Sequence, residues 1–194
     1  MFYRFFRFLI LIFFKIVFRL KVIGKEKIPD NSKFILCANH NSNWDPLAIA
    51  AAMDNQVYFM AKKELFKTKF TNWFFSKLGA FPVDRENADL KAMKKSLKIL
   101  KDGHCLGIYP EGTRTNKIDR EAMKNGVGFI ALKAKSNVVT AEIKDGYKIF
   151  RPVKVIIKDN LSIKDYEKLN NKEAVKRLSD DIFNSIYNNQ LEGE

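Results

Sequence analysis

Short apolar runs alternate with amphipathic stretches along most of this chain. The runs have the length and composition of buried strands and cover residues 33–38, 57–60, 80–83, 104–109, 138–143 and 152–157. In the stretches between them apolar residues recur every three or four positions, which predicts helices at residues 45–53, 64–77, 88–101, 128–134, 162–169 and 172–188. Strands that alternate with helices predict an α/β fold, with a mixed, mostly parallel sheet flanked by helices. The chain of 194 residues is long enough for one such domain and too short for two with a linker.

The N-terminal segment follows a different pattern, an apolar run at residues 8–14 between basic residues. A helix that spans a bilayer needs roughly 20 apolar residues, and a signal peptide ends in small residues, so the segment fits neither class. On a helical wheel the basic residues gather on about one third of the circumference, and apolar side chains cover the rest. These basic residues are Arg4, Arg7, Lys15 and Arg19.

Such a helix would lie in a membrane interface, with its apolar side chains among acyl chains and its cations near lipid phosphates. The alternative is a terminal helix that packs on its own domain or pairs with another chain. The membrane interpretation divides the chain into a membrane-associating helix at residues 1–22 and a globular domain at residues 23–194. It also predicts peripheral, monotopic attachment to the cytoplasmic face of the cell membrane.

Net charge limits the choice of partners. The 35 basic residues outnumber the 22 acidic ones and give a net charge of +13, which favours a polyanion, either an anionic membrane surface or nucleic acid. The chain has no recognisable nucleic-acid-binding module, so we expect no nucleic-acid partner. Cys37 and Cys105 lie in apolar runs without the spacing of a metal site, which predicts buried free thiols and no bound metal.

The most informative residues are His40 and Asp45, in the segment Ala-Asn-His-Asn-Ser-Asn-Trp-Asp at residues 38–45. A neutral imidazole accepts a proton near pH 7, and a carboxylate fixes its tautomer and stabilises the imidazolium. Five residues correspond to roughly 140° around a helix, so the two side chains meet only across a turn. No Ser or Cys nucleophile has a recognisable spacing to the pair, so we expect a base that activates the substrate's own hydroxyl. The alternative is a loop histidine followed by an N-cap aspartate.

Three further blocks follow in order: Ala-Lys-Lys-Glu-Leu-Phe at residues 61–66, Gly-Ala-Phe-Pro-Val-Asp-Arg at 79–85 and Tyr-Pro-Glu-Gly-Thr-Arg at 109–114. With the His-x4-Asp segment they resemble the glycerophosphate acyltransferase family, and within it the bacterial 1-acylglycerol-3-phosphate acyltransferases. The resemblance covers residues 25–157. One block is altered, because residues 138–143 read Val-Val-Thr-Ala-Glu-Ile without the expected proline. This departure leaves the acceptor specificity open and does not touch His40 and Asp45.

The resemblance implies a role for each block. It implies that His40 is the base, that Asp45 orients it, and that Arg85 contacts the glycerol phosphate of the acceptor. The other substrate-binding candidates are Lys62, Glu111, Gly112, Thr113 and Arg114. Arginine forks suit phosphate whereas a carboxylate repels it, so we expect Glu111 to pair with an arginine. The neighbouring Lys63 is an alternative to Lys62.

These assignments predict an acyltransferase domain at residues 23–194. It would move a fatty acyl group from acyl-CoA or acyl-carrier protein to the free hydroxyl of 1-acylglycerol 3-phosphate and form phosphatidate, without a cofactor or metal. Transfer to glycerol 3-phosphate or another lysolipid is the alternative within this class. From other classes, a non-catalytic membrane lipid-binding module would not need His40 and Asp45, and a thioesterase would not need two phosphate-binding arginines.

Overall fold

The computed structural model describes residues 1–30, 33–84, 89–115 and 117–191, with side chains up to residue 188. Within these ranges one sheet of seven strands has the order β1-β7-β6-β2-β5-β3-β4. The strands are β1 Lys21–Ile23, β2 Ile35–Ala38, β3 Val57–Lys62, β4 Ala80–Val83, β5 Cys105–Ile108, β6 Val138–Lys144 and β7 Lys154–Leu161. Neighbouring strands are parallel except β6 and β7, so the sheet is mixed and mostly parallel, as predicted.

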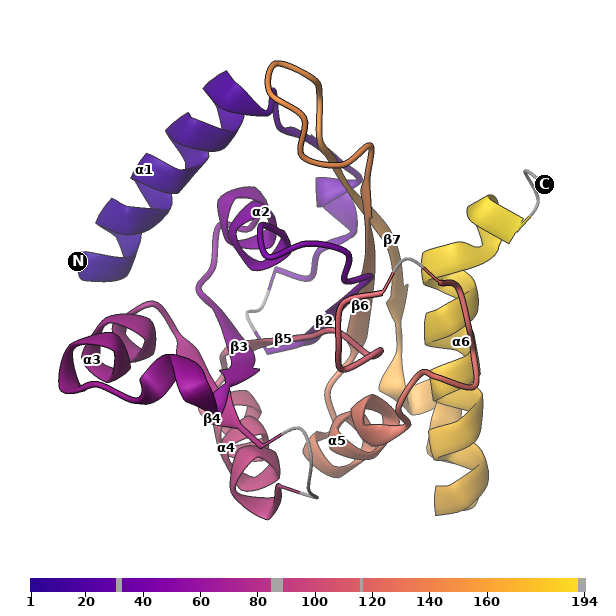
Figure 1. The fold of residues 1–194 in the computed structure, drawn as a ribbon. Helices are drawn as coiled ribbons and strands as arrows, with labels where there is room; N and C mark the ends of the chain where they lie inside the picture. The colour runs from indigo at the N-terminus through magenta and orange to yellow at the C-terminus, as the bar shows by residue number, and fades with distance from the viewer. Residues whose placement is uncertain (31–32, 85–88, 116, 192–194) are drawn as a thin grey trace.

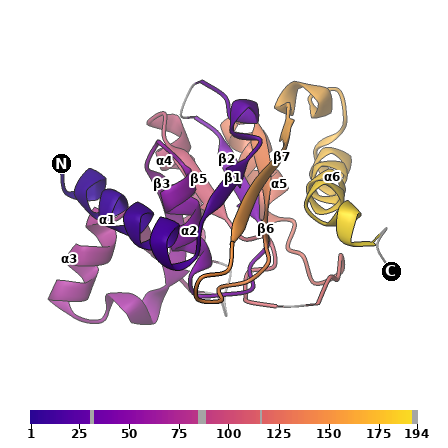
Figure 2. The same ribbon diagram turned by 90° about the horizontal axis from the view of Figure 1, so that it is seen from above.

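Helices cover both faces of the sheet (Figure 1). They are α1 Phe2–Val17, α2 Asp45–Ala52, α3 Lys69–Lys77, α4 Leu90–Lys101, α5 Gly126–Ala134 and α6 Asn171–Leu191, with short 3-10 helices η1 Lys25–Lys27, η2 Lys63–Phe66 and η3 Ile163–Tyr166. Side chains alternate along β2, so Leu36 joins the core under α1 and α2 while Ile35 and Cys37 join the core under α4, α5 and α6. The view from above shows these two layers on either side of the strands (Figure 2). The single α/β domain is therefore confirmed.

Three elements differ from the sequence prediction. Residues 64–77 divide into η2 and α3, because Thr68 and Thr71 exchange hydrogen bonds between side chain and backbone and start a new helix. The helix predicted at residues 162–169 is reduced to η3. β1 was not predicted, because a strand of three residues, Lys-Val-Ile, is too short to give a periodic signal.

α1 packs one side against the domain and exposes the other. Phe14 is fully buried, and Phe18, which follows the helix, is 4% exposed. The opposite side carries apolar residues at helical spacing that are 39–63% exposed: Phe5, Phe8, Leu9, Ile12, Phe13 and Ile16. One side of α1 therefore packs on its own domain, and the other side keeps an exposed apolar face. No helix in the described ranges is long and apolar enough to cross a bilayer.

The cluster of four basic residues expected on this helix is only partly present. Arg7 turns toward α2, where its Nε donates to the carbonyl oxygens of Ala50 (3.2 Å) and Met53 (2.6 Å). α1 ends at Val17, so Arg19 lies beyond the helix. The expectation that Arg7 faces lipid is wrong, because its guanidinium ties α1 to the carboxyl end of α2.

Candidate active site

The four sequence blocks meet because each follows one of four neighbouring parallel strands. β2 leads to His40, β5 leads to residues 109–114, β3 ends at Lys62, and β4 ends just before Arg85. These strands lie side by side in the order β2-β5-β3-β4. The carboxyl ends of parallel strands open at one edge of the sheet, where ligand sites of α/β proteins usually lie. The topology therefore brings the four blocks to one place.

His40 and Asp45 form a buried pair across the turn that follows β2. The imidazole Nδ1 lies 2.9 Å from Asp45 Oδ2, and the two side chains are 9% and 1% exposed. A carboxylate accepts hydrogen bonds, so Nδ1–H is the donor to Asp45, and in this tautomer Nε2 carries the free electron pair. The arrangement orients the imidazole so that Nε2 can accept a proton.

Asp45 is held by three further donors. The backbone N–H groups of Asn41 and Ser42 donate to Oδ2 at 2.8 and 2.7 Å, and the Tyr147 hydroxyl donates to Oδ1 at 2.6 Å. Burial and the charge of Asp45 raise the pKa of Tyr147, which keeps this hydroxyl protonated as a donor. The alternative of an N-cap aspartate is wrong, because Trp44 is the N-cap of α2 and Asp45 is its first residue. Its carboxylate binds the preceding turn instead.

A stack of aromatic rings holds the imidazole on one side. The Tyr109 ring lies 4.1 Å from the His40 ring at an interplanar angle of 15°, and Phe59 stacks on Tyr109 at 5.8 Å. Gly107 lies against Phe59, and a Cβ at this position would come within 2.2 Å of the Phe59 ring. A glycine is therefore required where this stack crosses β5.

Glu111 lies behind His40 and is almost fully buried. Its Oε1 accepts the Tyr187 hydroxyl from α6 and the His40 backbone N–H at 3.4 Å. Burial raises the pKa of the Glu111 carboxyl, while hydrogen bonds from Tyr187 and from backbone N–H groups act against this rise. No arginine that the structure describes pairs with it, so the expected arginine partner is not found there. The carboxyl group instead links α6 to the turn that carries His40.

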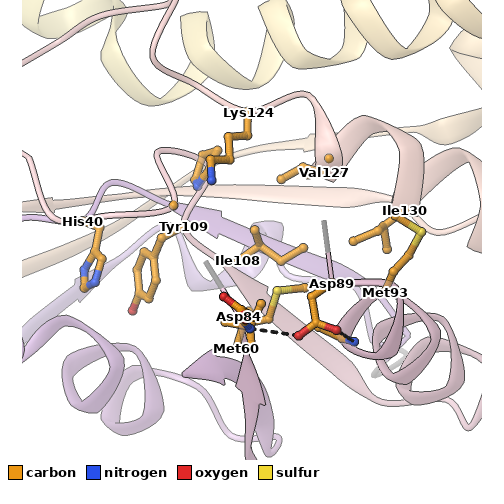
Figure 3. Close-up of a pocket in the computed structure, with 16 residues that line it drawn as sticks. His40, Met60, Asp84, Asp89, Met93, Ile108, Tyr109, Lys124, Val127 and Ile130 are labelled. Carbon is orange, nitrogen blue, oxygen red and sulfur yellow. Dashed lines mark hydrogen bonds between the residues drawn. The ribbon is translucent and has the colours of Figure 1, made fainter. Parts of the chain in front are cut away.

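Two cavities meet at His40 and Tyr109, which line both. The first, of about 320 Å³, lies between the sheet edge and helices α4 and α5 (Figure 3). Its apolar lining comprises Met60, Val83, Ala92, Met93, Ile108, Val127 and Ile130. The second, of about 490 Å³, lies between α1, α2 and β3, and its apolar lining includes Ile10, Leu47, Val57, Phe59, Leu65 and Leu78. The base thus lines two apolar chambers.

Two of the predicted substrate-binding residues line the second cavity, Lys62 and Arg114. The Lys62 amine lies 3.7 Å from the Glu64 carboxylate, and the neighbouring Lys63 pairs with Asp84 at 2.8 Å. Lys62 is therefore the lysine of the pair that lines a cavity with His40.

The remaining substrate-binding candidates lie in different places. Gly112 lines the first cavity with a φ of 69°, and a Cβ there would lie 3.2 Å from the side chain of Lys124, which lines the same cavity. Thr113 is exposed and lines neither cavity. Arg85 lies outside the described residues, so its contact with phosphate stays a prediction.

Sequence reasoning missed two residues that support the site, Tyr147 and Tyr187. Tyr147 lies in the connection between β6 and β7, and Tyr187 lies on α6. Neither belongs to a motif, and each reaches its partner only after the whole sheet and its helix layers have assembled. No local signal in the sequence could have identified them.

The altered family block lies on β6 and lines neither cavity. The ladder between β6 and β7 is irregular between Val139 and Ala141, and the hydroxyl of Thr140 accepts the Asp159 N–H there at 3.0 Å. An irregularity of this kind is where a strand tolerates proline. The missing proline thus concerns how β6 joins β7, while Ile143 of the same block exchanges two hydrogen bonds with Asn39, the neighbour of His40.

The two cysteine thiols are packed inside the domain. Cys37 and Cys105 are free and fully buried, as predicted, and burial raises the pKa of both. Within the described ranges, no group of three or more His, Cys, Asp or Glu side chains could hold a metal ion. The thiols are therefore packing residues with little thiolate character.

Comparison with known proteins identifies related chains. A family model described as "Acyltransferase" matches residues 19–144. A 1-acyl-sn-glycerol-3-phosphate acyltransferase of Bacillus subtilis is 34% identical over 82% of this chain and 82% of its own length. A protein of the same description from Streptococcus pneumoniae is 38% identical over 59% of this chain and 43% of its own length. The crystal structure of a 1-acyl-sn-glycerophosphate acyltransferase from Thermotoga maritima matches with a TM-score of 0.65 and 25% identity, over 93% of this chain and 80% of that chain.

Proposed function

This chain belongs to the acyltransferase family, and we propose that it acylates 1-acylglycerol 3-phosphate to phosphatidate, with an acyl thioester as donor. The observation that carries the proposal is the buried, oriented pair of His40 and Asp45, in which His40 lines two apolar cavities. Donor and acceptor each carry an acyl chain, so a transfer between them needs two apolar chambers that share one reactive point. A module that only binds lipid would need one chamber and no oriented base.

His40 Nε2 takes the proton of the acceptor hydroxyl, whose oxygen attacks the thioester carbonyl carbon. The charge of the resulting imidazolium is stabilised by Asp45, which four donors including His40 Nδ1 hold in place. The tetrahedral intermediate then breaks its C–S bond, and the imidazolium returns the proton to the leaving thiolate. The products are phosphatidate and the free thiol, and no acyl-enzyme forms.

The acceptor's phosphate would be bound by cations beside the second cavity. Arg114 and Lys62 line this cavity together with His40. Arg85 is a third candidate, on the basis of its sequence block. Binding energy from the phosphate positions the hydroxyl against Nε2, and positioning of this kind supports turnover as well as affinity.

We extend the proposal to the acyl donor and to attachment at the membrane. Acyl-CoA and acyl-carrier protein both present a thioester to an apolar chamber, so either is a possible donor. The exposed apolar face of α1 would attach the protein peripherally to the cytoplasmic face of the cell membrane, with no cofactor required for the transfer.

In the test, purified protein receives a labelled acyl thioester and one acceptor from a panel. The thioester is supplied either as acyl-CoA or as acyl-carrier protein. The panel contains 1-acylglycerol 3-phosphate, its dephosphorylated analogue, glycerol 3-phosphate, a zwitterionic lysolipid and water alone. We expect phosphatidate as the main product, and Arg114→Ala should lose the preference for the phosphorylated acceptor over its dephosphorylated analogue. Label found mainly in free fatty acid, in acylated glycerol 3-phosphate or in another lipid class would contradict the proposal.

A further inference from the structure

The connection between β6 and β7 ends in an exposed apolar tip that the active site does not use. Ile149 and Phe150 are 68% and 61% exposed, and the sequence around them reads Lys-Ile-Phe-Arg at residues 148–151. Both flanking cations are exposed as well. Two large apolar side chains between two cations are thus mostly exposed to solvent. Their composition matches the edge of a lipid bilayer, which is apolar inside and carries anionic phosphates at its surface.

The backbone of this tip is a tight turn with an unusual conformation. The Arg151 N–H donates to the Lys148 carbonyl at 3.0 Å, and Phe150 has a φ of 59°. A bulky side chain is disfavoured in this left-handed region, where glycine or asparagine is usual. The turn therefore keeps a large apolar residue at the position where packing and backbone preferences both favour a small or polar one.

The turn is attached to the end of α1. The Phe150 N–H donates to the Val17 carbonyl at 2.7 Å, and the Val153 N–H donates to the Phe18 carbonyl at 2.9 Å. Figure 1 shows the connection between β6 and β7 beside the carboxyl end of α1, and Figure 2 shows the two close together from above. Trp44 lies beside α1, since its ring stacks on Phe13 at 5.7 Å and is 40% exposed.

The charges around the turn fit an anionic lipid surface better than an apolar patch on another protein. The one acidic residue within the turn region, Asp145, is neutralised by Lys154 at 2.7 Å. Carboxylates thus do not outnumber the exposed cations of the turn and of the α1 face. Tryptophan at the boundary of such a surface is typical of membrane interfaces.

We propose that residues 148–151 form a second membrane-insertion element beside α1, which buries Ile149 and Phe150 in an anionic bilayer. The inference rests on the membrane attachment of α1 proposed above. It extends the lipid-facing surface from one helix to a helix and a turn, so the domain has a fixed orientation on the membrane. The same connection carries Tyr147, so the inserted turn directly follows a residue that binds Asp45.

The first experiment measures depth directly. Ile149→Cys is labelled with an environment-sensitive fluorophore, which the buried native thiols permit, and the full chain is mixed with vesicles of phosphatidylcholine and phosphatidylglycerol. We expect a blue shift of the emission and quenching by nitroxides on the acyl chains. Phe129→Cys, an exposed position on α5 in the opposite layer, is the matched control and should show neither change.

The second experiment removes the apolar tip without changing the turn. The double variant Ile149→Ser/Phe150→Asn keeps a residue that accepts the left-handed conformation. We expect its partition to these vesicles to fall by roughly ten-fold or more, because two large apolar side chains are lost from the interface. Activity on a short-chain, water-soluble acceptor should not change.

The outcomes separate the two proposals. A label at position 149 that stays in water while the wild-type chain binds vesicles would overturn the inference about the turn and leave the attachment by α1 standing. Wild-type protein that does not bind vesicles would overturn both. Equal partition of the double variant and the wild type would also contradict insertion of the turn.

Discussion

At the scale of single residues, the chemistry depends on which imidazole nitrogen of His40 carries the proton. Asp45 receives Nδ1–H, two backbone amides and one hydroxyl, so the carboxylate is fixed before substrate arrives. We expect His40→Ala to lower kcat by about 10²–10⁴, because a general base is removed. Thermal unfolding and vesicle binding should match the wild type. A folded variant with near-normal turnover would contradict the mechanism.

Tyr147→Phe tests the positioning of Asp45. The variant removes one of the four donors to the carboxylate and keeps the aromatic ring that packs against Phe14 and Phe18. We expect kcat to fall roughly ten-fold with little change in KM, because a hydrogen bond to a charged group is lost without loss of substrate contacts. The melting temperature should change little. An equal rise in KM with unchanged kcat would show that Tyr147 acts on substrate binding instead.

Glu111→Gln tests the cost of a buried carboxyl group. The native pKa of Glu111 is raised mainly by burial, so the folded protein binds the proton more tightly than the unfolded chain. Wild-type stability therefore falls as pH rises from the unfolded pKa through the native one, and it is constant above that window. Glutamine keeps an acceptor for Tyr187 and His40 but carries no charge. We expect the variant to melt above the wild type near neutral pH, by roughly 2–4 °C per kcal/mol gained, and the difference to shrink in acid. A difference that does not depend on pH would contradict this account.

At the scale of elements, the sequence predicts the strands that lead to the site closely. The strand at residues 80–83 is predicted to the residue, and those ending near His40, Lys62 and Glu111 within a few positions. Strands buried on both faces are continuous apolar runs, so their signal is local. The break between η2 and α3 depends on a hydroxyl exchange at Thr68, and the antiparallel placement of β7 depends on the rest of the sheet.

In the site, too, the sequence shows local contacts and not distant ones. The pair His40 and Asp45 is visible in the sequence because both lie on one short turn. Tyr147 and Tyr187 are not, since each contact crosses about 75 to 100 residues of chain. Glu111 was recognised as a member of its block, but its partner was not, because the direction of its side chain depends on α6.

Gly107→Ala tests the element that carries the aromatic stack. The added methyl group would overlap the Phe59 ring, which must move from Tyr109 and so release the His40 imidazole on one side. We expect kcat to fall about ten-fold and stability to fall by about 1–3 kcal/mol, as in other overpacked cores. The control is Gly107→Ala/Phe59→Leu, in which the smaller side chain makes room and recovers part of the stability. No effect of the single substitution on either property would contradict the role of the stack.

At the scale of the whole molecule, α1 belongs both to the core and to the proposed lipid surface. Deleting it would uncover the core around Phe14 and Phe18, so polar substitution of the exposed face is the sharper test. We expect Phe5→Gln/Phe8→Gln/Ile12→Gln to reduce binding to anionic vesicles by roughly 100-fold, because three exposed apolar side chains are lost. Activity should fall more on a long-chain acceptor in vesicles than on a short-chain soluble one. Phe129→Gln is the control, and unchanged vesicle binding by the triple variant would rule out α1 as the anchor.

The order of strands in the sheet has a consequence for synthesis of the protein. β1 at the sheet edge pairs with β7, and the carbonyl groups at the end of α1 accept hydrogen bonds from Phe150 and Val153. These partners leave the ribosome about 135 residues after Phe18, a delay of roughly ten seconds at common elongation rates. During that interval the inner face of α1 can already pack on α2, but the end of α1 and β1 lack their hydrogen-bond partners. The N-terminal segment therefore joins the sheet late in synthesis, after the strands that carry His40 and residues 109–114 have been made.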